Sequence, residues 1–287
     1  MSGERFERIL DRPVVLSYTC YDVLHHGECG EGTPKPAGLE GISPGSTNRE
    51  RIRIVTEVLA DLRERGLAVV DTPVRPLRDT IRLLHEPQRR IYGWYAIRGD
   101  EGTTYGGFHA AESDGCAVLA AEEDGRVLLE PVPSDVLLST VVSLLPDAEP
   151  IADTAMVVAP ERPPRRVPVK PEDEWAESGD EVRRPHSARE ALQRKHDRIE
   201  ELTSGPLDFA MQVGRSTRTA KGGERVCDHP LNYYAGRQGA LLTVVKRARA
   251  DGAEGDGAEE DGDLRRHVLP ATPDVFRQEL RELGRTR

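Results

Sequence analysis

Two stretches of the 287-residue chain, 115–145 and 239–283, have the same order of strand, turn and helix. In each, a short apolar strand is followed by a turn, a second strand that ends near a proline, and an amphipathic helix. A repeat with a period of about half the chain indicates an internal duplication rather than a solenoid. The alternative is two unrelated strand–turn–helix units, since such units are common. The residue pairs that share one constant offset are Pro131 and Pro270, Asp135 and Asp274, Val136 and Val275, Leu137 and Phe276, and Leu144 and Leu283.

Hydrophobic spacing predicts the rest of each half. A helix is expected from a cap at Thr47 or Asn48 to Arg65, because Ile52, Val55, Leu59 and Leu62 recur at helical spacing, and Gly66 occupies the position of a C-terminal αL residue. A second helix is expected over 76–85 and a third from Ser134. Strands are expected over 91–97, 104–110, 116–121 and 127–130, and again over 207–213, 225–234, 239–246 and 264–269. We therefore predict an α+β fold of two antiparallel-sheet-plus-helix halves related by a pseudo-two-fold.

Composition suggests where the halves meet. Residues 159–186 are rich in Pro, Arg and Glu and read as a linker between an N-terminal half, 1–158, and a C-terminal half, 187–287. The second half opens with a charged helix over 187–203 whose apolar stripe is thin, so this helix is either peripheral or packs on a partner. The acidic, Gly-rich insertion 251–263 is expected to be a mobile hairpin tip.

Charge and hydropathy exclude several classes of protein. A net charge of −10 and a pI near 5.4 argue against broad nucleic-acid binding and against anchoring on an anionic membrane. The N-terminus has no basic-then-apolar signal pattern. The longest apolar run, 136–145, is far below the roughly 20 residues that span a bilayer. We expect a cytoplasmic protein without membrane insertion.

Motifs for catalysis or cofactor binding are missing from the sequence. There is no phosphate-binding Gly-rich loop, dinucleotide fingerprint, zinc-protease motif or nucleophile elbow. The stretch that begins at Asp251 lacks the alternate carboxylates and terminal Glu of a calcium loop. His109, Glu112, Asp228 and His229 lie in the two meanders, but no spacing singles them out. We expect no enzyme activity, no catalytic residue and no cofactor.

Cys20, His25, His26 and Cys29 form the only metal-like cluster in the sequence. Thiolate and imidazole could reach one tetrahedral ion, but zinc sites usually combine two separated ligand pairs. The favoured interpretation is therefore two reduced cysteines near a helix end with exposed histidines, and no metal. Cys116 and Cys227 lie in apolar strand patterns and read as small buried hydrophobes.

Taken in order, these features resemble the EspG-type, ESX (type VII) secretion-associated proteins of actinobacteria. The opening 14–24, the L-x-x-R-G-L pattern over 62–67 and the L-L-x-x-P pattern over 83–87 are similar to the family's first segments. The Gly-rich meander, the Leu-Leu-Pro at 144–146, the segment 228–237 and the stretch 267–273 follow in family order. Each motif is weak by itself, and the resemblance rests on their order over most of the chain.

The resemblance implies a pseudo-two-fold α+β fold and a chaperone activity that is not catalytic. Such proteins bind the helical tip of PE–PPE secretion substrates, keep them soluble and address them to their own secretion system. The client here would be a PE–PPE pair or another small helical ESX substrate, and the protein a monomer or weak dimer. Two other classes stay open: an enzyme or ligand-binding protein with a site between the halves, and a self-associating scaffold.

If the resemblance holds, the loop 98–104 with its flanking aromatic residues and the helix 187–203 are the expected partner-binding elements. Exposed aromatic side chains on a sheet are favourable anchors for a partner. Their ordinary alternative is sheet packing, and Asp100 and Glu101 fit a solvated hairpin turn equally well. The expected partner-binding residues are Tyr92, Trp94, Asp100, Glu101, Tyr105, Leu192 and Ile199.

Overall fold

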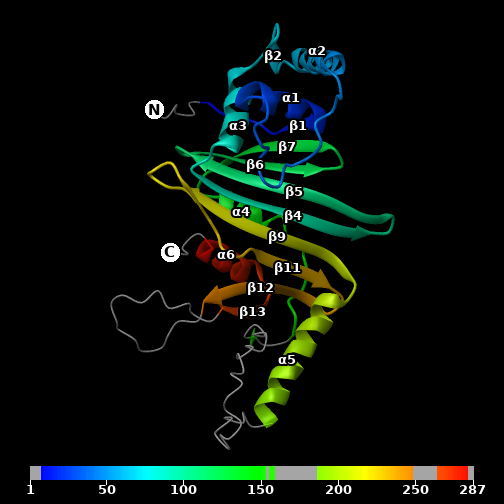
Figure 1. Ribbon diagram of the computed structural model, residues 1–287, viewed down its shortest axis with the longest axis vertical. Helices are drawn as coiled ribbons and strands as arrows, with labels where there is room; N and C mark the ends of the chain where they lie inside the picture. Colours follow the sequence, from blue (N-terminus) through cyan, green and yellow to red (C-terminus); the bar gives the residue numbers. More distant parts are fainter. Residues whose placement is uncertain (1–7, 153–154, 159–185, 248–263, 284–287) are drawn as a thin grey trace, which may run out of the picture.

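The computed structural model describes residues 8–152, 155–158, 186–247 and 264–283 (Figure 1). Its helices are α1 (Tyr18–Cys29), α2 (Asn48–Glu64), α3 (Arg75–His85), α4 (Leu137–Val142), α5 (His186–Ser204) and α6 (Pro273–Glu282). The strands of the first half are β1 (Val14–Ser17), β2 (Ala68–Val69), β3 (Thr72–Pro73), β4 (Arg89–Gly99), β5 (Gly102–Ser113), β6 (Cys116–Glu123) and β7 (Arg126–Pro133). The remaining strands are β8 (Met156–Val158), β9 (Leu207–Arg218), β10 (Glu224–Val226), β11 (Leu231–Gly236), β12 (Gly239–Arg247) and β13 (Leu264–Pro270).

One large antiparallel sheet runs through the molecule in the order β1-β7-β6-β5-β4-β9-β11-β12-β13-β8, with β10 paired to β9. The two halves are joined inside this sheet, because β4 and β9 pair along nine residues, from Arg89 opposite Thr217 to Ile97 opposite Phe209. The sequence predicted a sheet in each half. The structure has a single sheet that both halves share.

Helices α1, α2 and α3 cover one face of the sheet over β1, β7 and β6 (Figure 1). Thr47 caps α2, one of the two residues that the sequence predicted for this role, and it forms a reciprocal capping box with Glu50. Glu28 of α1 forms salt bridges with Arg78 and Arg82 of α3, at 2.7 and 2.9 Å. These ion pairs hold the two helices against each other. The core under these helices includes Leu16, Tyr21, Leu62, Leu77, Leu84 and Val118.

Helices α4 and α6 lie on the opposite face, across the middle of the sheet (Figure 1). Phe276 and Leu280 of α6 are fully buried and belong to the same cluster as Phe108 and Tyr233 of the sheet. The ring of Tyr233 meets that of Phe276 edge-on at 6.2 Å. This second core therefore spans both halves.

A third, smaller cluster attaches α5 to the face that α1–α3 also occupy. Ile199 and Leu202 pack with Leu241 and Val268 of the sheet and with Met156 of β8. β8 was placed in the first half by a boundary at 158, yet it pairs with β13 of the second half. The linker 159–186 falls, except for its last residue, outside the described residues, and so does the insertion 251–263.

Most predicted elements are confirmed, including the helices over 48–64 and 75–85, and the strands of the first meander have longer bounds than predicted. The helix predicted from Ser134 begins later, at Leu137, and ends at Val142. The strand predicted over 225–234 is wrong, because Pro230 lies between two separate strands, β10 and β11. Within the described residues, no helix is both long and apolar enough to cross a bilayer.

Candidate partner-binding surface

The middle of the sheet is uncovered on the face that carries α1–α3 at one end and α5 at the other. Residues directly opposite each other in an antiparallel ladder point to the same face. Trp94 is opposite Gln212, which is opposite Asn232, and Ala96 is opposite Tyr105 and Ala210. We call this surface the open face; its residues are Tyr92, Trp94, Ala96, Tyr105, Ala210, Gln212, Asn232 and Tyr234.

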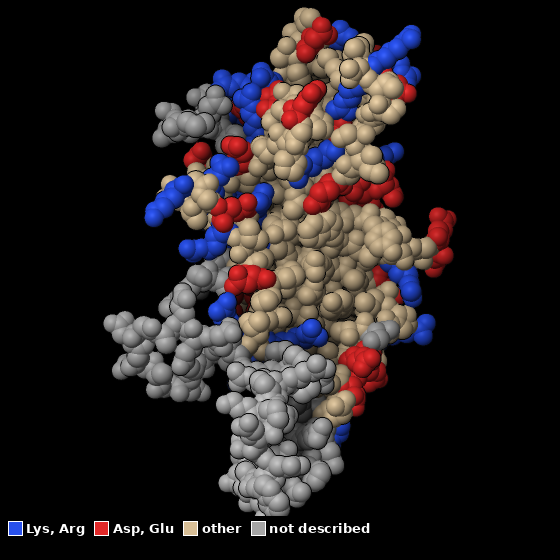
Figure 2. All heavy atoms as spheres, viewed as in Figure 1, with Lys and Arg blue, Asp and Glu red and all other residues tan. Residues whose placement is uncertain are grey.

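The open face is aromatic and carries no charged side chain of its own. Tyr105 is 72% exposed and Trp94 is 41% exposed, which is high for side chains of this size. Figure 2 shows the middle of this face as a broad surface of residues other than Lys, Arg, Asp and Glu, with charged groups around it. Contiguous exposed apolar surface with a polar rim is typical of a protein-binding site.

Trp94 is held in place from two sides. Its indole Nε1–H donates to Oε2 of Glu40 at 3.2 Å, and the ring of Tyr92 meets the indole edge-on at 5.9 Å. Tyr92 in turn packs over Gly214, where any Cβ would come within 2.7 Å of the tyrosine ring. Burial raises the pKa of Tyr92, so its phenol stays protonated. The aromatic pair is therefore ordered before any partner arrives.

The connection between α1 and α2 forms the upper border of the open face. Gly38 lies on β5 so closely that a Cβ on Gly107 would be 2.0 Å from the Gly38 carbonyl oxygen. Asp22 of α1 anchors this connection through Lys35 and Ser43, at 2.9 and 2.6 Å, and it pairs with Arg51 of α2 at 2.6 Å. Burial favours the neutral acid, but these hydrogen bonds outweigh it and lower the pKa of Asp22 to about 2.

A small cavity forms the lower border, where α5 meets the sheet. Its volume is about 190 Å³, and Tyr234 extends from the open face into its lining. Gln238 closes the rim by donating to Glu201 of α5 at 3.3 Å. The apolar lining is typical of a pocket that accepts a single side chain of a partner. The other lining residues include Leu202, Pro206, Leu207 and Leu241.

The residues expected from the sequence fall into two groups. Tyr92, Trp94 and Tyr105 come together on the open face. The expected loop 98–104 is instead a tight hairpin, because pairing continues to Gly99 opposite Gly102, and Asp100 and Glu101 form its exposed tip.

One of the two helix residues expected at the site, Ile199, packs against the sheet beneath α5. Ile199 is only 7% exposed and packs in the cluster that attaches α5, so its side chain holds the helix rather than offering a contact. Leu192 lies in α5, but its side chain falls outside the described residues.

Sequence reasoning missed the half of the open face that β9 and β11 contribute. The signal that could have found Ala210 and Gln212 is the alternation over 209–213, where Phe209, Met211 and Val213 are buried and the residues between them are not. Without the β4–β9 pairing, that alternation does not reveal which surface these residues join.

The candidate catalytic set is not brought together. His109 is fully buried, with Nδ1 2.9 Å from the carbonyl oxygen of Ala37. Glu112 lies three residues further along the same strand, so it points to the opposite face, where it pairs with Arg89. Asp228 is exposed after β10.

The metal-like cluster is split by the fold. Cys20 is buried in the core under α1–α3, and His26 faces Asp22 at 3.3 Å. His25 and Cys29 meet a residue that the sequence did not associate with them, His85 at the end of α3. These three are the described residues best placed to hold a metal ion.

Comparisons with known proteins bear on the whole chain. The model of the EspG family matches residues 22–282. A solved structure of the Mycobacterium tuberculosis type VII secretion system chaperone EspG5 in complex with the PE25–PPE41 dimer is similar, with a TM-score of 0.59 and 12% identity. The match covers 94% of this chain and 95% of that one. A search of curated proteins gave no match.

Proposed function

This chain belongs to the EspG family, and we propose from that premise that it is a cytosolic, non-catalytic chaperone of type VII secretion. Its client would be a PE–PPE heterodimer or a related helical substrate. The similar solved chaperone binds a PE–PPE dimer, which supports this choice of client. The protein would cover an apolar tip of the client, prevent its aggregation and carry it to the secretion system.

The observation that carries the proposal is the open face itself. Trp94 and Tyr105 are large, exposed and uncharged, and the surface leads toward an apolar cavity at the foot of α5. The tip of a helical hairpin offers a few apolar side chains on one turn. Such a tip could place one side chain in the cavity and others against the aromatic rings, in the manner of a helix in a groove.

We also infer that the two halves arose by duplication and are related by a pseudo-two-fold between β4 and β9. The strand order supports this. Counted from the two edges of the sheet inward, strands at equivalent positions follow one another in the same order along each half of the chain. From the edges, β1 corresponds to β8, β7 to β13, β6 to β12, β5 to β11 and β4 to β9. Helices α4 and α6 follow β7 and β13 in the same way. Superposition of 89–142 on the described residues of 207–282 tests the relation: an angle far from 180° would contradict it.

The test of function is a binding experiment with a purified PE–PPE heterodimer from the same genome. Size-exclusion chromatography should give a complex, and calorimetry its affinity. Trp94→Ala should weaken binding at least tenfold, since a central exposed aromatic anchor contributes about 2 kcal/mol.

Ile97→Ala is the matched control. Ile97 lies on the same strand with a similar exposure of 38%, but its side chain points to the opposite face. It should leave affinity unchanged. If no client of this class binds, or if both variants weaken binding equally, the proposed surface is wrong.

A further inference from the structure

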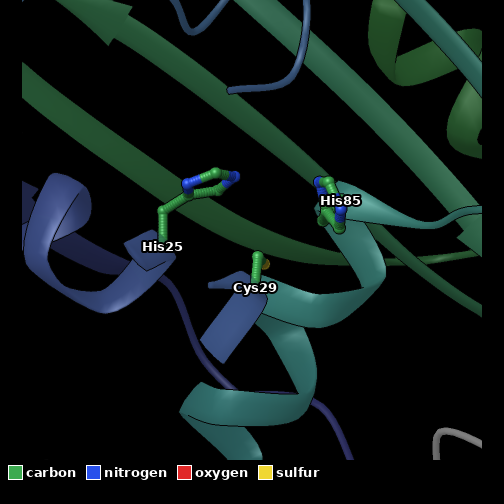
Figure 3. Close-up of side chains that lie close together, drawn as sticks. All are labelled: His25, Cys29 and His85. Carbon is green, nitrogen blue, oxygen red and sulfur yellow. The ribbon is translucent and has the colours of Figure 1, made fainter. Parts of the chain in front are cut away.

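Three metal-binding side chains meet between α1 and α3, away from the open face. They are His25 and Cys29 of α1 and His85, the last residue of α3. One ligand atom of each lies within 4.8 Å of the other two. Figure 3 shows the three side chains gathered around one space, two from one helix and one from the other. No role in partner binding explains this arrangement.

His25 makes the arrangement unusual. Its side chain is fully buried, and neither ring nitrogen has a hydrogen-bond partner among the described residues. Leaving a buried polar atom without a partner destabilises the fold. The rings nearest to it are those of His85, His26 and Tyr21, at 5.5, 5.6 and 6.1 Å between centroids. A metal ion bound to one nitrogen would satisfy part of this demand.

The protein scaffold fixes the ligands relative to one another. His25 and Cys29 are four residues apart in α1 and therefore lie on one side of the helix. Glu28 holds α3 through Arg78 and Arg82, which sets the position of His85. Gly30, with φ +98°, ends α1 immediately after Cys29. Cys29 and His85 are only partly buried, so an ion can reach them from solvent.

The donor atoms suit a metal ion. A neutral imidazole has one nitrogen lone pair free for a cation, and two imidazoles are present. The Cys29 thiol would release its proton to solvent when its sulfur binds the cation.

We propose that His25, Cys29 and His85 form a binding site for Zn²⁺, with three protein ligands and a fourth position open to solvent. One thiolate and two imidazoles are ligands that Zn²⁺ prefers in tetrahedral sites. With ordinary zinc bond lengths, such ligand atoms stand about 3.5 Å apart. The three side chains would have to close by roughly 1 Å, which rotation of Cys29 and His85 can supply. Bound zinc would clamp α1 to α3.

The experiment uses the whole chain, freed of metal with a chelator and kept reduced. Zn²⁺ is titrated in competition with a chromophoric chelator, and Co²⁺ is used as a spectroscopic probe. We expect a single Zn²⁺ per chain and a thiolate-to-cobalt charge-transfer band. Saturating Zn²⁺ should also raise the Tm, because it binds the folded state.

Cys29→Ser and His85→Asn should each weaken Zn²⁺ binding at least tenfold, and Cys29→Ser should abolish the charge-transfer band. The matched controls Cys116→Ser and His229→Asn, which lie outside the cluster, should bind as the wild type does. Circular dichroism confirms that each variant is folded, and Cys29→Ala replaces Cys29→Ser if the latter is not. Absence of stoichiometric binding to the wild type, or equal affinity in the ligand variants, would overturn the proposal. No client is present in these assays, so their result is independent of the chaperone proposal.

Discussion

Trp94 of β4 donates its indole N–H to Glu40, which lies 54 residues earlier in the connection between α1 and α2. The same carboxylate oxygen, Oε2, accepts the backbone N–H of Gly38 at 2.7 Å. One carboxylate therefore orders both the border of the open face and its main aromatic side chain. This link couples the conformation of the connection to that of the open face.

A double-mutant cycle between Glu40→Ala and Trp94→Ala should show coupling in client affinity. Loss of Glu40 frees the indole and its loop, so binding should weaken by less than it does on loss of Trp94, which costs about 2 kcal/mol. The double variant should bind about as weakly as Trp94→Ala, with a coupling energy on the order of 1 kcal/mol. Calorimetry with the PE–PPE client measures this. Strictly additive effects would mean that the hydrogen bond does not position the ring.

Gly107→Ala should destabilise the fold by about 2 kcal/mol, because the added methyl group overlaps backbone and cannot be relieved by a side-chain rotation. The carbonyl oxygen of Gly38 is 2.0 Å from the position of that methyl group. Gly99→Ala is the matched control on the neighbouring strand, since the nearest heavy atom there is 3.8 Å away. Urea denaturation compares the two. Equal stability of both variants would show that the connection does not rest on β5.

Acidification should destabilise the protein through His109. Burial lowers the pKa of this imidazole to about 4, against the hydrogen bond to Ala37, which favours the charged form. Between pH 6.5 and 4.5 the unfolded chain binds the proton and the folded chain does not, so stability rises with pH over this interval. The slope should be about 1 kcal/mol per pH unit for this residue. It should vanish above pH 7.

His109→Asn retains an N–H group near the position of Nδ1 and has no titrating ring. Its free energy of unfolding should depend less steeply on pH than that of the wild type, whatever its absolute stability. Denaturation at several pH values gives both slopes. A remaining slope is expected from His25, whose pKa is also lowered to about 4 by burial. Identical slopes in the two proteins would contradict the assignment to His109.

Ile199→Ala should release α5 from the sheet without unfolding the rest. The side chain of Ile199 is 7% exposed and packs in one cluster with Leu241 and Val268. Its truncation should therefore destabilise the attachment of α5 by about 2–4 kcal/mol. Hydrogen exchange should become faster in 193–203 and stay unchanged in β4 and β5. If exchange accelerates throughout the sheet instead, α5 is part of the global core. The exposed Glu200→Ala serves as the control on the same helix.

The local signals in the sequence predicted individual elements well. The cap at Thr47, the apolar stripe of α2 and Gly66, with φ +70°, are all properties of neighbouring residues, and each indicated the helix without reference to the rest of the chain. The strands of the first meander were recognisable for the same reason, because their turns at Asp114 and Asp124 carry hairpin sequences. The three-residue strand β8 is too short to have a period and was missed.

The surface could be predicted only in part, because it depends on pairing between distant strands. The sequence indicates Trp94 and Tyr105 as exposed aromatic residues within one hairpin. Gln212 and Asn232 joined them only through the ladders of β9 with β4 and β11, which no local pattern encodes. The metal candidate failed in the same way: His25 and Cys29 were found as neighbours in sequence, and their third partner, His85, came from another helix.

The β4–β9 ladder also determines the order in which the molecule can assemble. Its paired residues are about 120 positions apart, whereas the meanders of each half are built from hairpins between successive strands. Contacts between distant positions form slowly because a long loop must close first. The meanders can therefore form while β4 and β9 are still unpaired. Trp94 and Gln212 are opposite each other in the β4–β9 ladder. The complete open face therefore exists only after this ladder has formed. Before β4 and β9 pair, the chain would present the two parts of the open face separately.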